Sequence, residues 1–194
     1  MPEDSPAHHR RSIRLKGYDY TLAGAYFVTL VTWRRECLFG RIVEGEMRRN
    51  ELGEIVAKTW LETAIVRPNV VLDAFVVMPN HAHGVIVITD DGVGASRRLA
   101  PTDDCPNIDG HKYLHGAVSG SLGAILGQIK SLSTKRINAF RQTPGNPVWQ
   151  RNFYERIIRN EREMEAICAY IDANPRSWGE DELNRLLCGP GPSL

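Results

Sequence analysis

The chain has 194 residues, of which 42% are hydrophobic and 24% are charged, so it is long enough for one packed domain and too apolar for a disordered chain. The formal net charge is only +1, but seven Lys or Arg and a single Glu give residues 121–160 a net charge of +6. A basic stretch in an otherwise neutral chain favours a local binding site for a polyanion and argues against a protein that is basic over its whole surface.

Several classes of protein are excluded by simple patterns. No apolar run approaches the roughly 20 residues that a membrane-spanning helix needs, and residues 1–17 lack the apolar core of a secretory signal. The cysteines are scattered without a CxxC pair, which favours reduced thiols over a zinc ribbon or a disulfide scaffold. We therefore expect a cytoplasmic protein that has no membrane partner.

The first half of the chain alternates strand and helix patterns after a polar start. Residues 1–20 end in a basic cluster and are expected to form a mobile arm. Residues 25–33 are rich in β-branched and aromatic side chains and predict a strand, whereas apolar spacing over residues 46–66 predicts an amphipathic helix. Residues 69–77 and 81–88 are predicted to pair as a hairpin, because the Pro-Asn between them is typical of a turn.

The second half resumes this alternation after a long irregular segment. Residues 89–119 are rich in Gly and Pro and predict a flexible insertion. Helical spacing returns over residues 121–142, a fourth strand is expected within residues 148–158, and a last helix is expected from about residue 161 to residue 174. Residues 179–194 are expected to form a C-terminal tail.

This order predicts an α+β fold of the ferredoxin-like, RRM-like kind. The sequence β-α-β-β-α-β is that of a split β-α-β sandwich, with an antiparallel sheet, helices on one face, the other face open, and here an extra C-terminal helix. The fold serves many functions, so the function has to be argued from the site residues.

The most specific local pattern is His81-Ala82-His83 on the third predicted strand. Side chains alternate across a strand, so the two imidazoles project side by side while Ala82 points toward the helices. Two imidazoles on one face form a candidate metal clamp. The alternative is a pair of polar side chains on a solvated strand face.

A second pattern lies on the last predicted helix. Tyr170 and Asn174 are four residues apart and therefore neighbours on one helix face. The amide oxygen of Asn174 is a suitable hard ligand, so the pair could join the two histidines around one ion. Helix packing by Tyr170 and a helix stop at Asn174 before Pro175 is the alternative.

Four further motifs lie before and between the His81/His83 and Tyr170/Asn174 patterns along the chain. They are Tyr26-Phe27-Val28-Thr29, Val77-Met78-Pro79-Asn80, Trp149-Gln150-Arg151-Asn152-Phe153-Tyr154 and Ile158-Arg159-Asn160. With His81-Ala82-His83 and Tyr170-Ile171-x-x-Asn174-Pro175, they resemble the REP-associated tyrosine transposases, a branch of the single-tyrosine HUH transposases. The resemblance spans about residues 20–178 and implies a catalytic domain over residues 21–178.

The resemblance also implies roles for individual residues. His81 and His83 match two ligands of a divalent ion, Mg²⁺ or Mn²⁺, Asn174 matches the third ligand, and Tyr170 matches the nucleophile. The implied activity is the cleavage and rejoining of single-stranded DNA through a 5′-phosphotyrosine link. The implied partner is a REP-like DNA hairpin.

Cations and aromatic side chains around the second long helix and the fourth strand are the candidate DNA contacts. Lys and Arg would bind phosphates, and aromatic rings would stack on unpaired bases. The candidates are Lys130, Lys135, Arg136, Trp149, Arg151, Phe153, Tyr154, Arg156 and Arg159.

Alternatives remain open at this level. Tyr154 is a rival nucleophile, although only Tyr170 has a helical i+4 partner able to bind the same ion. A non-catalytic, RRM-like nucleic-acid-binding module would carry stacking aromatics on its central strands and need no metal. A metal-dependent nuclease would use water in place of the tyrosine. Both a monomer and a homodimer are compatible with the sequence.

Overall fold

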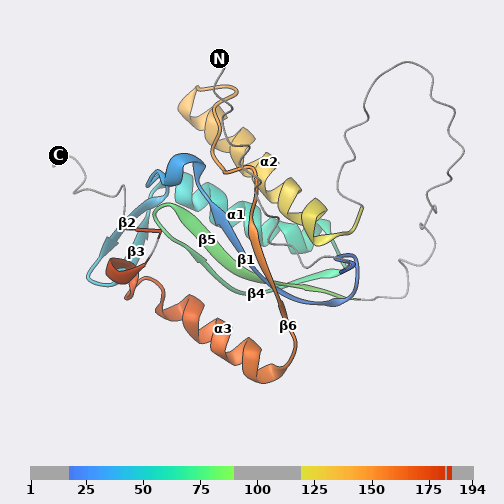
Figure 1. Ribbon diagram of the computed structural model, residues 1–194. Helices are drawn as coiled ribbons and strands as arrows, with labels where there is room; N and C mark the ends of the chain where they lie inside the picture. Colours follow the sequence, from blue (N-terminus) through green and yellow to red (C-terminus); the bar gives the residue numbers. More distant parts are fainter. Residues whose placement is uncertain (1–17, 90–118, 182, 185–194) are drawn as a thin grey trace, which may run out of the picture.

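The computed structural model describes residues 18–89, 119–181 and 183–184. Its centre is a four-stranded antiparallel sheet in the order β4-β5-β1-β6 (Figure 1). The strands are β1 (Gly24–Val31), β4 (Val70–Val77), β5 (His81–Ile88) and β6 (Tyr154–Ile158). Strand order and helix positions confirm the expected α+β, ferredoxin-like class.

The helices cover the two faces of the sheet unequally. Helices α1 (Glu51–Val66) and α2 (Leu122–Arg141) pack side by side on one face, and α3 (Glu161–Ala173) crosses the other (Figure 1). The main hydrophobic core lies beneath α1 and α2, and a smaller one lies beneath α3 around Ile167 and Ile171. The last helix therefore lies on the face that α1 and α2 leave uncovered.

Each helix begins at a side chain that caps its first free amides. The Asn50 side chain accepts from the amides of Leu52 and Gly53, and Ser121 and Asn160 cap α2 and α3 in the same manner. Such caps stabilise a helix by about 1 kcal/mol each. The pairing of β6 with β1 and the cap at Asn160 together fix where α3 begins relative to the sheet.

One expected element is wrong at its start. Residues 46–49 form strand β3 (Glu46–Arg49), which pairs with β2 (Gly40–Val43) in a separate hairpin, and the helix begins only at Glu51. Glu44 and Gly45 between the strands both have positive φ, as a two-residue hairpin turn requires. Two short 3₁₀ turns, Trp33–Arg35 and Trp178–Glu180, complete the described elements.

The expected arm, insertion and tail lie mostly outside the described residues. The arm up to residue 17 and the insertion over residues 90–118 lie outside the described residues, as does most of the tail. Tyr18 and Tyr20, which were expected in the arm, pack against the main core. None of the described helices is both long and apolar enough to cross a bilayer.

The expectation of reduced cysteines holds for one thiol and fails for another. Cys168 is a free thiol, whereas Cys37 is disulfide-bonded. A disulfide requires only that two thiols meet in the fold, and spacing along the chain does not reveal such a meeting.

A candidate metal centre beside an exposed tyrosine

Strand β5 brings two imidazoles together on the face that α3 crosses. His81 and His83 are 0% and 4% exposed, and their ring centroids lie 4.5 Å apart. Ala82 between them points the other way and belongs to the main core. The strand alternation expected from the sequence thus places both rings on one side of the sheet.

Hydrogen bonds at Nδ1 orient both rings. Nδ1 of His81 lies 2.8 Å from Oδ1 of Asn80, and Nδ1 of His83 lies 2.8 Å from Oγ1 of Thr29, which is opposite His83 on β1. Both Nε2 atoms are thereby directed away from these contacts. Partners of this kind fix the orientation and tautomer of metal-binding histidines.

Burial keeps the two rings neutral. Desolvation lowers the pKa of His81 to about 4, against a smaller opposite effect of the Asn174 side chain. Desolvation, together with the neighbouring His81, lowers the pKa of His83 to about 3, and the carboxylate of Asp181 opposes this shift weakly. A neutral imidazole retains the lone pair that a metal ion requires.

Asn174, at the C-terminal end of α3, is directed toward the imidazoles. It is 3% exposed because it follows the buried Ile167 and Ile171 on the helix face that meets the sheet. Its Oδ1 and the Nε2 of His81 are both buried without a hydrogen-bond partner among the described residues. Unsatisfied buried acceptors cost free energy, so a cation between them would remove an otherwise unexplained penalty.

The sequence patterns missed a fourth group, the carboxylate of Asp181. One ligand atom from each of His81, His83 and Asp181 can be chosen so that all lie within 4.8 Å of one another, and Oδ2 of Asp181 is 3.9 Å from Nε2 of His81. Asp181 follows the Trp178–Glu180 turn, in the segment that was expected to be a tail. Nothing in its local sequence marks it, because its position depends on contacts far along the chain.

Tyr170 lies at the open side of this cluster. Its hydroxyl is 3.4 Å from Nε2 of His83, and its ring meets Phe27 edge-on at a centroid distance of 6.0 Å. The side chain is 48% exposed, so an incoming substrate can reach the phenol. The structure thus brings all four expected residues, two histidines, one asparagine and one tyrosine, to one place.

The donor set fits a divalent cation. Two imidazole nitrogens, one amide oxygen and one carboxylate oxygen lie close together. Carboxylate and carbonyl oxygens are ligands that Mg²⁺ and Mn²⁺ prefer, whereas imidazole nitrogens are common ligands of transition metals. His81, His83 and Asp181 could hold the ion, with Asn174 beside them.

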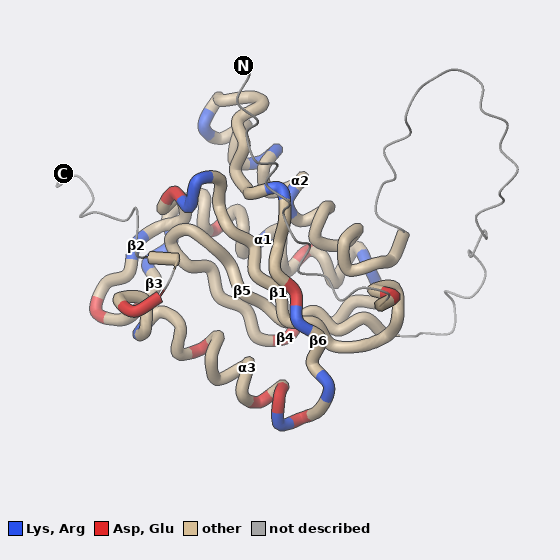
Figure 2. Tube along the Cα trace, in the orientation of Figure 1, with Lys and Arg blue, Asp and Glu red and all other residues tan. Residues whose placement is uncertain are grey.

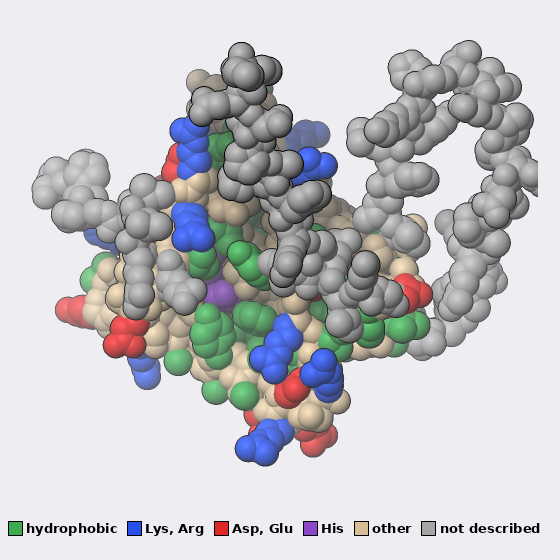
Figure 3. All heavy atoms as spheres, viewed as in Figure 1, with side chains coloured by type: hydrophobic (Ala, Val, Ile, Leu, Met, Phe, Trp, Pro, Cys, Tyr) green, Lys and Arg blue, Asp and Glu red, His purple; other side chains and the backbone are tan. Residues whose placement is uncertain are grey.

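Two of the expected DNA contacts flank the centre on the same face. In the pairing of β6 with β1, Tyr154 is opposite Thr29 and Arg156 is opposite Phe27. Both side chains are exposed, and Arg156 is 3.7 Å from Glu163. Figure 3 shows a histidine at the surface of this face, surrounded by hydrophobic side chains, with Lys and Arg side chains nearby.

Three other candidates are engaged in hydrogen bonds within the protein. Trp149 is 6% exposed and its indole donates to Ser133, which leaves little ring surface for stacking. Nζ of Lys130 donates to the carbonyl oxygens of residues 150 and 151, and burial lowers its pKa to about 8. Arg136 donates to Glu62 at 2.6 Å and joins α2 to α1.

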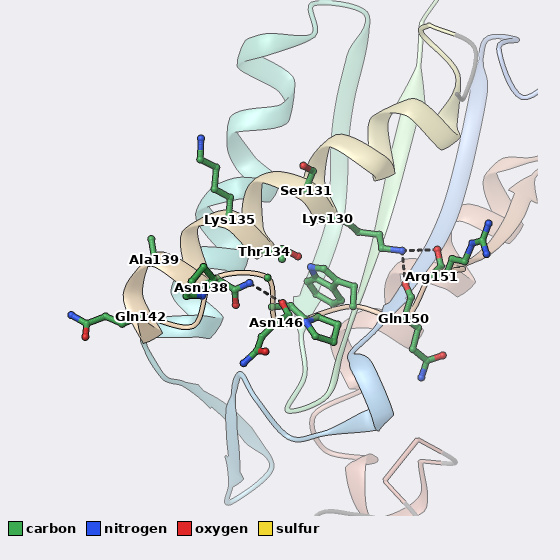
Figure 4. Close-up of a pocket in the computed structure, with 15 residues that line it drawn as sticks. Lys130, Ser131, Thr134, Lys135, Asn138, Ala139, Gln142, Asn146, Gln150 and Arg151 are labelled. Atoms are coloured by element: carbon green, nitrogen blue, oxygen red, sulfur yellow. Dashed lines mark hydrogen bonds between the residues drawn. The ribbon is translucent and has the colours of Figure 1, made fainter. Parts of the chain in front are cut away.

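The remaining candidates near α2 border a pocket of about 720 Å³ between this helix and residues 144–151 (Figure 4). Lys135 stands at its outer rim and Arg151 at its other end (Figure 4). Among the described residues, none of those that line the pocket is Asp or Glu. Phe153 is partly buried against the main core, and Arg159 is exposed at the start of the turn into α3. Figure 2 shows the charged residues along α2, β6 and this turn.

Comparisons with known proteins agree with this fold. No family model matches the chain. An uncharacterized protein of Haemophilus influenzae is 38% identical over 176 residues, which cover 91% of this chain and 93% of that protein. The solved structure of a REP-associated tyrosine transposase bound to a REP hairpin superposes with a TM-score of 0.53 at 18% identity, covering 87% of this chain and 77% of that chain. At this identity the likeness shows a shared fold.

Proposed function

We propose that this chain, which belongs to the same family as the Haemophilus influenzae protein, is a metal-dependent transesterase that cleaves and rejoins single-stranded DNA through Tyr170. The observation that carries the proposal is the exposed phenol at 3.4 Å from the Nε2 of a buried, neutral histidine. The hairpin partner of the structural neighbour supports single-stranded hairpin DNA, of REP-like type, as the substrate.

In this proposal His81, His83, Asn174 and Asp181 hold Mg²⁺ or Mn²⁺. When bound, the ion supplies a positive charge that polarises the scissile phosphate. The burial of His81, His83 and Asn174 serves this purpose, because it excludes water from their lone pairs.

The proposed reaction begins with attack by the Tyr170 oxygen on the phosphorus. A new P–O bond to the tyrosine forms, the bond to the leaving 3′ oxygen breaks, the phenol proton passes to water, and the leaving oxygen takes a proton from water. The product is a 5′-phosphotyrosine and a free 3′-hydroxyl. A DNA hydroxyl that later attacks the same phosphorus releases the tyrosine and restores a phosphodiester, so rejoining needs no nucleotide cofactor.

DNA binding in this proposal falls to the exposed cations and aromatic rings around the centre. Arg156 and Tyr154 lie on its face of the sheet, and Lys135 and Arg151 border the pocket beside α2. Lys and Arg would contact phosphates, and the exposed Tyr154 ring is suited to stacking on an unpaired base.

The two other functions receive less support. An RRM-like binding module presents aromatic rings on its central strands, whereas the described parts of β1 and β5 carry no exposed aromatic side chain and α3 lies over them. A nuclease that uses water would not need an exposed phenol beside the imidazoles. The rival nucleophile, Tyr154, lies on a strand and has no helical neighbour that could bind the same ion.

The deciding experiment is a search for a covalent protein–DNA adduct. The protein is incubated with a labelled single-stranded hairpin and Mn²⁺ and analysed on a denaturing gel. We expect an adduct that is lost in Tyr170→Phe and retained in Tyr154→Phe. His81→Ala should also abolish it without unfolding the protein.

The opposite pattern, with the adduct lost only in Tyr154→Phe, would assign the nucleophile to β6. Cleavage without any adduct that persists in Tyr170→Phe would favour the nuclease. Metal-independent binding without cleavage would favour the binding module.

A further inference from the structure

Asn80, in the turn between β4 and β5, makes an unusually complete set of side-chain contacts. Its side chain is fully buried, and its Nδ2 donates to the carbonyl oxygens of Arg35 at 3.2 Å and Leu183 at 2.8 Å. Its Oδ1 lies 2.8 Å from Nδ1 of His81. One amide therefore joins three segments that are distant in the sequence.

The chemistry of these partners sets the direction of every bond. Carbonyl oxygens only accept, so the two contacts to Arg35 and Leu183 require the amide nitrogen on that side. The oxygen is then opposite His81 and can only accept, so the imidazole must carry its proton on Nδ1. Nε2 of His81 then carries no proton, and its lone pair is directed toward Asp181.

The contact to Leu183 also affects Asp181, the carboxylate of the candidate metal centre. The amide of Leu183 donates to Oδ1 of Asp181 at 2.7 Å, which leaves Oδ2 directed toward Nε2 of His81 at 3.9 Å. Through Leu183, which lies 103 residues further along the chain, Asn80 thus holds the same turn that positions the Asp181 carboxylate.

We propose that Asn80 is a positioning residue of the metal centre, which sets the tautomer of His81 and fastens the turn that carries Asp181. The proposal rests on the proposed function only through the metal ion. Removing the amide would release both groups together, since one side chain makes both contacts. Partners of metal-binding histidines typically account for a 10- to 100-fold change in affinity.

The test uses Asn80→Ala with Asn138→Ala as the matched control. Asn138 is also a buried asparagine whose Nδ2 donates to a backbone carbonyl, that of Asn146, but it lies beside the pocket on α2. Both variants lose a buried hydrogen-bonded amide, so a general loss of stability affects both. Folding is followed by circular dichroism.

Two readouts need neither DNA nor Tyr170. Nitrogen-15 NMR of the metal-free protein reports which ring nitrogen of His81 carries the proton, and calorimetry with Mn²⁺ alone reports the affinity. We expect Nδ1–H in the wild type and in Asn138→Ala. In Asn80→Ala we expect a shift toward Nε2–H and a Mn²⁺ affinity at least about 10-fold weaker.

A wild-type His81 that carries its proton on Nε2 overturns the proposal without any variant. So does an Asn80→Ala protein that keeps the Nδ1 proton or the wild-type Mn²⁺ affinity. Failure of the adduct experiment with these readouts intact would instead reject the phosphotyrosine chemistry and leave the role of Asn80 standing.

Discussion

At the scale of single residues, the environment of His81 and His83 determines what they can do. Both rings are buried, and desolvation lowers both pKa values well below that of an exposed histidine. The rings are therefore neutral near pH 7 and ready to bind a cation without first losing a proton. The same burial makes the folded protein sensitive to acid.

The first prediction concerns this acid sensitivity. The unfolded chain takes up a proton on each histidine below about pH 6.5, whereas the folded protein resists until about pH 4 for His81 and about pH 3 for His83. The unfolded state then binds more protons, so the free energy of unfolding falls as the pH falls from 6.5 to 4, by at most about 1.4 kcal/mol per pH unit for each ring.

Urea unfolding in EDTA at several pH values measures this slope. The variant His81→Gln/His83→Gln should show a smaller slope over the same window. An equal slope in the variant would mean that other groups cause the acid sensitivity.

A second prediction at this scale concerns Asp181. Asp181→Asn removes a charge but keeps the size of the side chain, so we expect Mn²⁺ affinity to fall at least about 10-fold, as for other groups that hold a bound metal in place. Asp172→Asn is the control, because this exposed residue lies on α3 between Tyr170 and Asn174. Calorimetry with Mn²⁺ measures both, and equal losses would show that only net charge matters.

At the scale of elements, strand β5 serves both faces of the sheet. Its outer face carries the two imidazoles, and on its inner face Gly84 leaves room for Trp60 of α1, whose ring stacks on Phe75. A Cβ at Gly84 would come within 2.4 Å of Trp60. The close approach of the Trp60 ring to β5 thus depends on a glycine that directly follows His83.

The third prediction follows from this contact. Gly84→Ala should lower the free energy of unfolding by about 1–3 kcal/mol, because Trp60 must move in a packed core. Gly127→Ala should raise it by about 0.5–1 kcal/mol, because Gly127 lies within α2 and a Cβ there meets nothing within 4 Å. Thermal unfolding compares the two variants, and equal effects would contradict the packing at Gly84.

The elements also show how far local patterns predict this structure. The two-residue period of β5 predicted that the two imidazoles share one face, and the helical spacing predicted that Tyr170 neighbours Asn174, since each pair depends on the geometry of one element. That the two pairs meet at one site was implied only by the family resemblance. The β2–β3 hairpin was missed because its turn is Glu44-Gly45. Both residues have positive φ, and Glu at the first position does not mark such a turn as Asn or Asp would. Asp181 could not be found, because its place depends on the long-range contact between Asn80 and Leu183.

At the scale of the whole molecule, the basic stretch divides into two kinds of cation. Lys130 and Arg136 are used within the protein, where they join α2 to its neighbours. Lys135 and Arg151 are exposed on either side of the pocket, and Arg156 lies beside the candidate metal centre. The excess charge of residues 121–160 is thus available to a polyanion only in part.

The last prediction uses two neighbours on α2. Lys135→Gln should leave stability unchanged and lower the salt dependence of single-stranded DNA binding by about 0.7 in the slope of log K against log salt, as expected for one lost phosphate contact. Arg136→Gln should leave this slope unchanged, because Glu62 already pairs with the guanidinium, and should lower the free energy of unfolding by roughly 0.5–1 kcal/mol. Fluorescence anisotropy with Tyr170→Phe as the background measures binding without cleavage, and urea unfolding measures stability. If the slope of log K against log salt is equal for Lys135→Gln and for the Tyr170→Phe background, Lys135 contacts no phosphate. The DNA would then not bind along the exposed side of α2.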